Sequence, residues 1–243
     1  MFSLLTTLYS YKNKLYSKTP LMLSLLTKLC NYEDALYLQI KYKICFRPQT
    51  KDELQRAINL WCSNRQEAIH NYGYINKWDT SKITDISRLF SCKCSSIFDY
   101  TAYNGDEPYY NGDEPYYKCT CLKQNFNDDI NQWNISNVIN TSHMFKDCID
   151  FNQYIGEWNV SNIIDMENMF YCCTTFDQPL DKWNVSNVRN MQRMFLQAQE
   201  FNQNISNWDT KKLMYDYHMF SIWSERAMEE KNKPELIGCP REF

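Results

Sequence analysis

The feature that most constrains the fold of this chain is a strict repeat of 25 residues. One Trp and two Phe positions return at that interval, namely Trp133, Trp158, Trp183 and Trp208, then Phe145, Phe170, Phe195 and Phe220, then Phe126, Phe151, Phe176 and Phe201. A fixed period between about 20 and 50 residues predicts a repeat architecture. Because one repeat cannot bury its own apolar side chains, we expect Trp to stack on Trp and Phe on Phe in one continuous core.

An insertion interrupts the repeat near its start. An earlier copy begins at Trp78, which lies 55 residues before Trp133, so the first coil carries 30 residues more than one period. Within this excess the heptad NGDEPYY occurs twice in succession, at residues 104–117. Added loop length costs little closure entropy, so we interpret residues 95–118 as a loop extruded from the first coil.

The apolar spacing within one coil predicts its secondary structure. In the coil that begins at Trp158, the apolar residues are Ile163, Met166, Met169 and Phe170. The pattern of a β-branched residue followed three later by Met, which is Val-x-x-Met in the next coil, favours a short strand. Met-Phe-x-x-Cys favours a short helix or a 3₁₀ turn. Neighbouring strands about 4.8 Å apart would form a parallel sheet. The sequence therefore predicts an α/β solenoid, in which each 25-residue coil has a short parallel strand and a short helix.

Polar residues also recur at fixed positions of the coil. The recurring side chains are Asn134, Asn159 and Asn184, then Asn137, Asn162 and Asn187, then Gln153, Gln178 and Gln203. In a tight coil such side chains can bond the turning backbone, which would otherwise lack partners. We therefore predict a structural role for these positions.

A helical cap is predicted before the first coil. Thr50 and Glu53 have the spacing of a capping box, and the helix that follows would place Leu54, Ala57, Ile58 and Trp61 on one face. A second short helix would start at residues 63–66 and stop at Gly73. The predicted organisation is an N-terminal segment (1–44), with short helices or poor order, a helical cap (45–77), the repeats (78–220), and a C-terminal cap and tail (221–243).

Composition limits the partners and the compartment. The net charge is -3 without a long basic run, which excludes nucleic acid and anionic membranes as expected partners. The sequence has no run of 18 apolar residues, so no transmembrane helix is predicted. The start of the chain has no secretory signal pattern, and the 11 Cys form an odd number. Thiols in a reducing, intracellular compartment are the expectation.

Four cysteines flank the insertion, namely Cys92, Cys94, Cys119 and Cys121. Four thiolates at the neck of a loop could bind zinc tetrahedrally, or form disulfides in an oxidising compartment. Cys-x-Cys is a weaker zinc signal than Cys-x-x-Cys, and Cys148 and Cys173 occupy a small core position that Ala198 fills in the next coil. We therefore expect plain thiols and no cofactor, with zinc as the alternative.

Exposed aromatic residues and histidines complete the candidate sites. The doubled heptad contains Tyr109, Tyr110, Tyr116 and Tyr117. Such Tyr pairs beside Gly, Asn and Asp resemble adaptable contact loops and could anchor a partner, or they could fold back on the repeats. The histidines His70, His143 and His218 are interpreted as partly exposed helix residues, because no Cys or Ser is placed to form a triad with them.

The repeat motifs resemble a known family. WNVSNV, then NMxxMF, then FNQxI at a 25-residue period resemble the mycoplasma-type branch of the BspA-like leucine-rich-repeat surface proteins. The resemblance spans residues 78–220, and the segment before Trp78 is similar to the segment that precedes such arrays. It implies a leucine-rich-repeat-like solenoid with a role in surface attachment or protein binding. It provides no catalytic residues.

These observations predict a non-enzymatic repeat protein that mediates protein–protein interaction. Binding would use the exposed face of the parallel sheet, the insertion 95–118, or both. Two alternatives stay open. The chain could be an adaptor or regulatory subunit of an enzyme complex that docks through its N-terminal helical segment. It could also be a secreted or surface adhesin, which would require export.

Overall fold

The computed structural model describes residues 46–91, 122–220 and 229–236. The described residues all belong to one unit of the chain, Phe46–Phe243. Within these residues no helix has the length and the apolar character needed to cross a membrane.

Two helices precede the coils. Helix α3 spans Lys51–Ser63 and helix α4 spans Arg65–Tyr72, followed by the 3₁₀ turn η1 at Ile75–Lys77. As predicted, the Thr50 side chain accepts a hydrogen bond from the N–H of Glu53. The Glu53 carboxylate, however, accepts from the N–H of Gln49. The second helix begins at Arg65, within the predicted start at residues 63–66, and Asn64 provides its N-cap.

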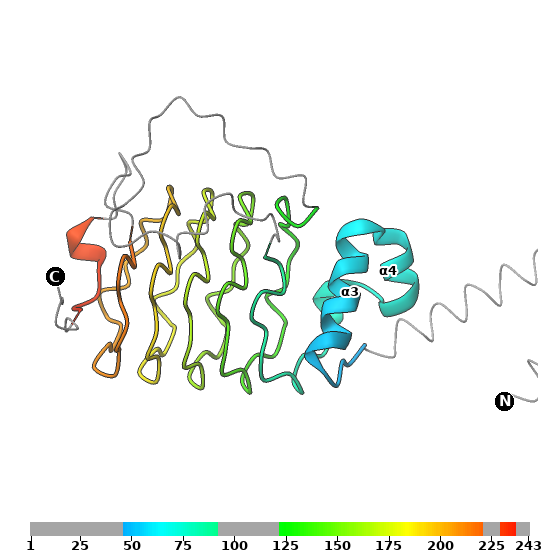
Figure 1. The fold of residues 1–243 in the computed structure, drawn as a ribbon, viewed down its shortest axis with the longest axis horizontal. Coiled ribbons are helices and arrows are strands. Elements are labelled where there is room, and N and C mark those ends of the chain that lie inside the picture. The colour runs from blue at the N-terminus through cyan, green and yellow to red at the C-terminus, as the bar shows by residue number, and fades with distance from the viewer. Residues whose placement is uncertain (1–45, 92–121, 221–228, 237–243) are drawn as a thin grey trace, which may run out of the picture. The chain divides into compact units, whose positions relative to one another are not determined.

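Helix α3 packs against the first coil (Figure 1). It buries Leu54, Ala57, Ile58 and Trp61, and the Trp61 ring meets the Trp78 ring edge-on at 5.8 Å between centroids. The Trp61 indole N–H donates to the Asp128 carboxylate at 2.8 Å. Helix α3 thus covers apolar side chains that the first coil would otherwise expose to water.

The repeats form coils that lie side by side (Figure 1). Equivalent backbone positions of successive coils are joined by parallel bridges, which link Asp85, Asn140, Asp165, Asn190 and Tyr215 in that order. Inside the coils, Phe90, Phe145, Phe170, Phe195 and Phe220 stack with ring centroids 5.5, 5.7, 5.5 and 5.8 Å apart. The predicted Phe-on-Phe core is confirmed.

The predicted α/β leucine-rich-repeat fold is wrong. Throughout the described residues the chain forms no strand and no sheet, and between Trp78 and Phe220 those residues contain no helix. The β-type pairing between coils in these residues consists of isolated bridges. Each coil is a series of tight turns, in which an N–H donates three residues back, as Met169 does to Met166 and Cys173 does to Phe170.

Left-handed residues lie in and beside the part of each coil where a short helix was predicted. Ten residues after the Trp of each coil, φ lies between 52° and 60°, at Arg88, His143, Asn168, Arg193 and His218. Four residues later φ is again positive, at Asp147, Cys172 and Gln197. A positive φ is incompatible with a right-handed helix and with extended backbone, so neither element can continue through these positions. The apolar residues three apart therefore mark successive turns whose side chains point inward.

The recurring Asn side chains bond the backbone, as predicted, and many of these bonds join neighbouring coils. Of the recurring Gln side chains, Gln203 also bonds a backbone carbonyl, whereas Gln153 and Gln178 donate to Asn side chains of the preceding coil. The Asn162 side-chain amide donates to the Ser136 carbonyl of the preceding coil at 2.7 Å. Asn159 instead accepts from the N–H of Ser161 within its own coil. In a further series, each side-chain oxygen accepts a hydrogen bond from a backbone N–H about 25 residues later in the chain. The accepting residues are Asn127, Asn152, Asp177 and Asn202.

Candidate functional site

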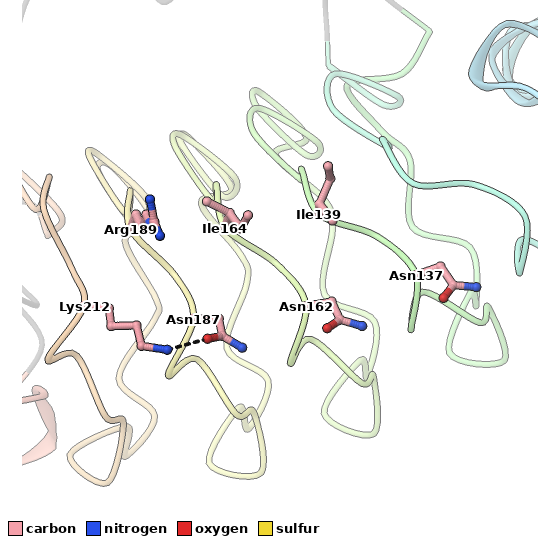
Figure 2. Close-up of a pocket in the computed structure, with 7 residues that line it drawn as sticks. All are labelled: Asn137, Ile139, Asn162, Ile164, Asn187, Arg189 and Lys212. Carbon is pink, nitrogen blue, oxygen red and sulfur yellow. Dashed lines mark hydrogen bonds between the residues drawn. The ribbon is translucent and has the colours of Figure 1, made fainter.

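A shallow groove runs across four successive coils (Figure 2). It has a volume of about 410 Å³ and is lined by Asn137, Ile139, Asn162, Ile164, Asn187, Arg189 and Lys212. Two positions of the repeat supply all seven side chains, the fourth and the sixth after Trp. The residue between these positions, such as Val138 or Ile163, is buried, so its two neighbours point outward.

The coil backbone holds one side of the groove in register. The N–H of Ile164 donates to the carbonyl of Ile139 at 2.9 Å, and the N–H of Arg189 donates to that of Ile164 at 2.8 Å. Met214 continues the series at 2.8 Å from the Arg189 carbonyl. The side chains of this row therefore stand at a spacing that the coil stack imposes.

Exposed apolar side chains gather on this face. Ile139 is 49% exposed, Ile164 is 43% exposed and Met214 is 49% exposed. Tyr215 and Tyr217, after Met214 in the sequence, are 55% and 54% exposed and do not line the groove. Among the described residues, seven large hydrophobic side chains are exposed, and three of them occupy the sixth position after Trp in this row. Ile139 and Ile164 are neighbours in the row, and Arg189 lies between Ile164 and Met214. An exposed apolar patch typically marks an interaction site.

The charged residues of the groove are all cationic. Arg189 and Lys212 line it, and no carboxylate does. The Lys212 ammonium donates to the Asn187 side-chain oxygen at 2.7 Å (Figure 2). The Arg189 guanidinium has neither a hydrogen-bond acceptor nor a carboxylate partner among the described residues. This end of the groove therefore suits a negatively charged group.

His143 lies in a turn and is uncharged near neutral pH. Burial, with the nearby charges of Arg88 and Lys146, lowers the pKa of His143 to about 4. Its Nδ1 is buried without a hydrogen-bond partner, and its Nε2 lies 3.2 Å from the Arg88 guanidinium. His218 also lies in a left-handed turn. The prediction that these two histidines belong to helices is wrong, whereas His70 is an exposed residue of α4.

We expect His143 to make the stability of the chain depend on pH. In the unfolded chain His143 takes up a proton below its ordinary pKa of about 6.5, but in the folded chain it does so only near 4. Between these values the unfolded state binds more protons, so stability falls as pH is lowered. The melting temperature of His143→Asn, measured by circular dichroism from pH 7 to 4, should fall less than that of the wild type. If the melting temperatures of the variant and the wild type fell equally with pH, the lowered pKa of His143 would be contradicted. Asn is chosen because Asn168 adopts the same left-handed conformation in the next coil.

The sites predicted from sequence lie outside the described residues. These are the zinc alternative at Cys92, Cys94, Cys119 and Cys121, and the contact residues Tyr109, Tyr110, Tyr116 and Tyr117. Elsewhere, Cys148 and Cys173 fill the predicted core position, where their thiols donate to the carbonyls of Phe90 and Phe145. In the part of the chain that the structure describes, no group of three or more His, Cys, Asp or Glu side chains could hold a metal ion.

Sequence reasoning missed the groove. The sequence predicts a structural role for its Asn residues, which their hydrogen bonds support, and it gives no prediction for the position two residues further on. A signal was present at that position, where Ile139 and Ile164 are apolar in register and Arg189 follows. It was weak because Ile at a single exposed position of a turn is not informative without the neighbouring coils.

The stacked 25-residue coils, joined by parallel bridges and preceded by a helix pair, define a turn-built repeat protein. The chain belongs to the family described as "Mycoplasma protein of unknown function, DUF285", whose model matches residues 61–104 and 115–232. The matched range includes every residue that lines the groove. No curated protein and no solved structure matches the chain.

Proposed function

We propose that the chain is a non-enzymatic interaction module that binds a protein partner along the groove. The observation that carries this proposal is the row of exposed Ile139, Ile164 and Met214. Burying apolar surface contributes about 25 cal/mol per Å², so a partner that covers this row gains affinity from it.

The construction of the row supports the same proposal. Its residues are held by backbone hydrogen bonds of 2.8–2.9 Å between coils, so little ordering of the backbone is needed when a partner binds. Arg189 provides a cation without a partner in the described residues, which can select an acidic group on the partner. A binding role agrees with the attachment or protein-binding role implied by the resemblance to BspA-like surface proteins.

The proposal is tested with Ile164→Asp, which places a charge in the centre of the apolar row. We expect it to weaken binding of the partner at least tenfold, or about 1.4 kcal/mol, because the carboxylate must be desolvated against apolar groups. The partner is first captured from native extract on the wild-type chain and identified. Its affinity for the purified variants is then measured by calorimetry.

Gln199→Asp is the matched control, since it adds the same charge at an exposed residue outside the groove. It should bind the partner as the wild type does. A partner that binds both variants with unchanged affinity would contradict the proposal. A chain without residues 95–118 separates the groove from the insertion. Binding that is lost in this chain and kept in Ile164→Asp would assign the partner to the insertion.

A further inference from the structure

We infer that the groove accepts an amphipathic α-helix of the partner, with apolar side chains at one end of its contact face and a carboxylate at the other. This inference rests on the proposed function, because it concerns the occupant of the same groove. Two independent observations carry it, namely the spacing of the coils and the distribution of charge along them.

The step from coil to coil matches one turn of an α-helix. Equivalent Phe rings lie 5.5–5.8 Å apart, and parallel bridges hold backbones about 4.8 Å apart. An α-helix repeats its contact face every ~5.4 Å through residues i, i+3 or i+4, and i+7. It can therefore place one side chain on each coil of the groove.

An extended peptide does not keep this register. Its side chains on one face repeat every ~6.7 Å, so over three coil steps it overshoots the row by roughly 3–6 Å. Three turns of a helix cover about 16 Å, which falls within the span of three coil steps at about 4.8–5.8 Å each. The four coils of the groove thus suit a helix of three to four turns.

Charge gives the helix a direction. The apolar residues Ile139 and Ile164 lie on two successive coils, and the cations Arg189 and Lys212 lie on the next two. A helix with two apolar side chains over the Ile pair would place its next turns at the cations. A carboxylate there can pair with the Arg189 guanidinium through two parallel hydrogen bonds. The negative, C-terminal end of the helix dipole is also favoured beside cations.

Two displayed peptide libraries of equal length test this inference against the immobilised full chain. One presents randomised residues on the face of a stable helix. The other is linear and carries a central Pro, which blocks a helix. Both are counter-selected against the double variant Ile164→Asp, Arg189→Glu, so that only binders specific for the groove are kept. Thermal unfolding of that variant is compared with the wild type first, to show that it folds.

We expect binders from the helical library, with two apolar residues one turn apart and an acidic residue one to two turns further on. Their Kd, measured by fluorescence polarisation, should rise at least tenfold with either Ile164→Asp or Arg189→Glu, and stay unchanged with Gln199→Asp. Replacing the acidic residue of the peptide by Lys should restore binding to Arg189→Glu. Binders that need the groove but come only from the linear library would overturn the helical occupant and leave the proposed function standing. If neither library yields a binder that needs the groove, both proposals are overturned.

Discussion

Replacing Phe170 by Ala is expected to lower the free energy of unfolding by about 3–5 kcal/mol. The Phe170 side chain is fully buried. Its ring stacks on Phe145 at 5.7 Å and on Phe195 at 5.5 Å, and it lies 4.3 Å from the ring of Phe176 in its own coil. The cavity left by Ala would therefore remove contacts with the coils on both sides. In a stack held together by nearest-neighbour contacts, such a loss weakens both interfaces.

Urea unfolding followed by far-ultraviolet circular dichroism measures this effect. Ile139→Ala is the control, because Ile139 belongs to the same repeat array but is 49% exposed. Surface substitutions of this kind usually change stability by less than about 0.5 kcal/mol. Similar changes for the two variants would show that the Phe stack is not the core of the protein.

Asn152→Leu should destabilise the protein by about 1–3 kcal/mol, the cost of leaving a partly buried donor without an acceptor. The Asn152 side-chain oxygen accepts from the N–H of Asp177 at 3.0 Å and from the Gln178 amide at 2.9 Å. Both donors belong to the next coil. Leu branches at the same carbon as Asn and cannot accept a hydrogen bond, so the substitution removes the link between coils while keeping the length of the side chain.

Asn159→Leu is the comparison for this experiment. Asn159 is exposed and accepts only from Ser161, within its own coil, where water can replace the lost acceptor. The loss of unfolding free energy caused by Asn159→Leu should be smaller than that caused by Asn152→Leu by about 1 kcal/mol or more. Equal losses in the melting temperatures of the two variants would mean that bonds between coils contribute no more than bonds within them.

The stacking of equivalent residues was predictable from sequence. Phe145, Phe170 and Phe195 recur at one interval, and identical coils can bury identical side chains only against one another. The cap was predictable for a local reason, since the Thr50 side chain and the N–H of Glu53 meet within one helical turn. In both cases the signal lies in the spacing of residues along the chain.

The conformation of each coil was not predictable in the same way. Arg88, His143 and Arg193 are left-handed, although none of them is Gly, Asn or Asp, the residues that favour this region. Their N–H groups donate to carbonyls of the next coil, as His143 does to Glu167 at 2.7 Å. The turns that replace the predicted strand and helix are thus accompanied by hydrogen bonds between coils. The spacing of residues within one coil does not reveal these bonds.

By itself, the sequence determined the period, the inward-facing side chains and the position of the helix pair, because these depend on spacing along the chain. Only the tertiary structure decided the fold class and the groove. The fold class depends on hydrogen bonds between residues about 25 positions apart, such as Met166 and Asn190. The groove exists only when Ile139, Ile164 and Arg189 are brought into one row, and that alignment comes from the stacking of whole coils.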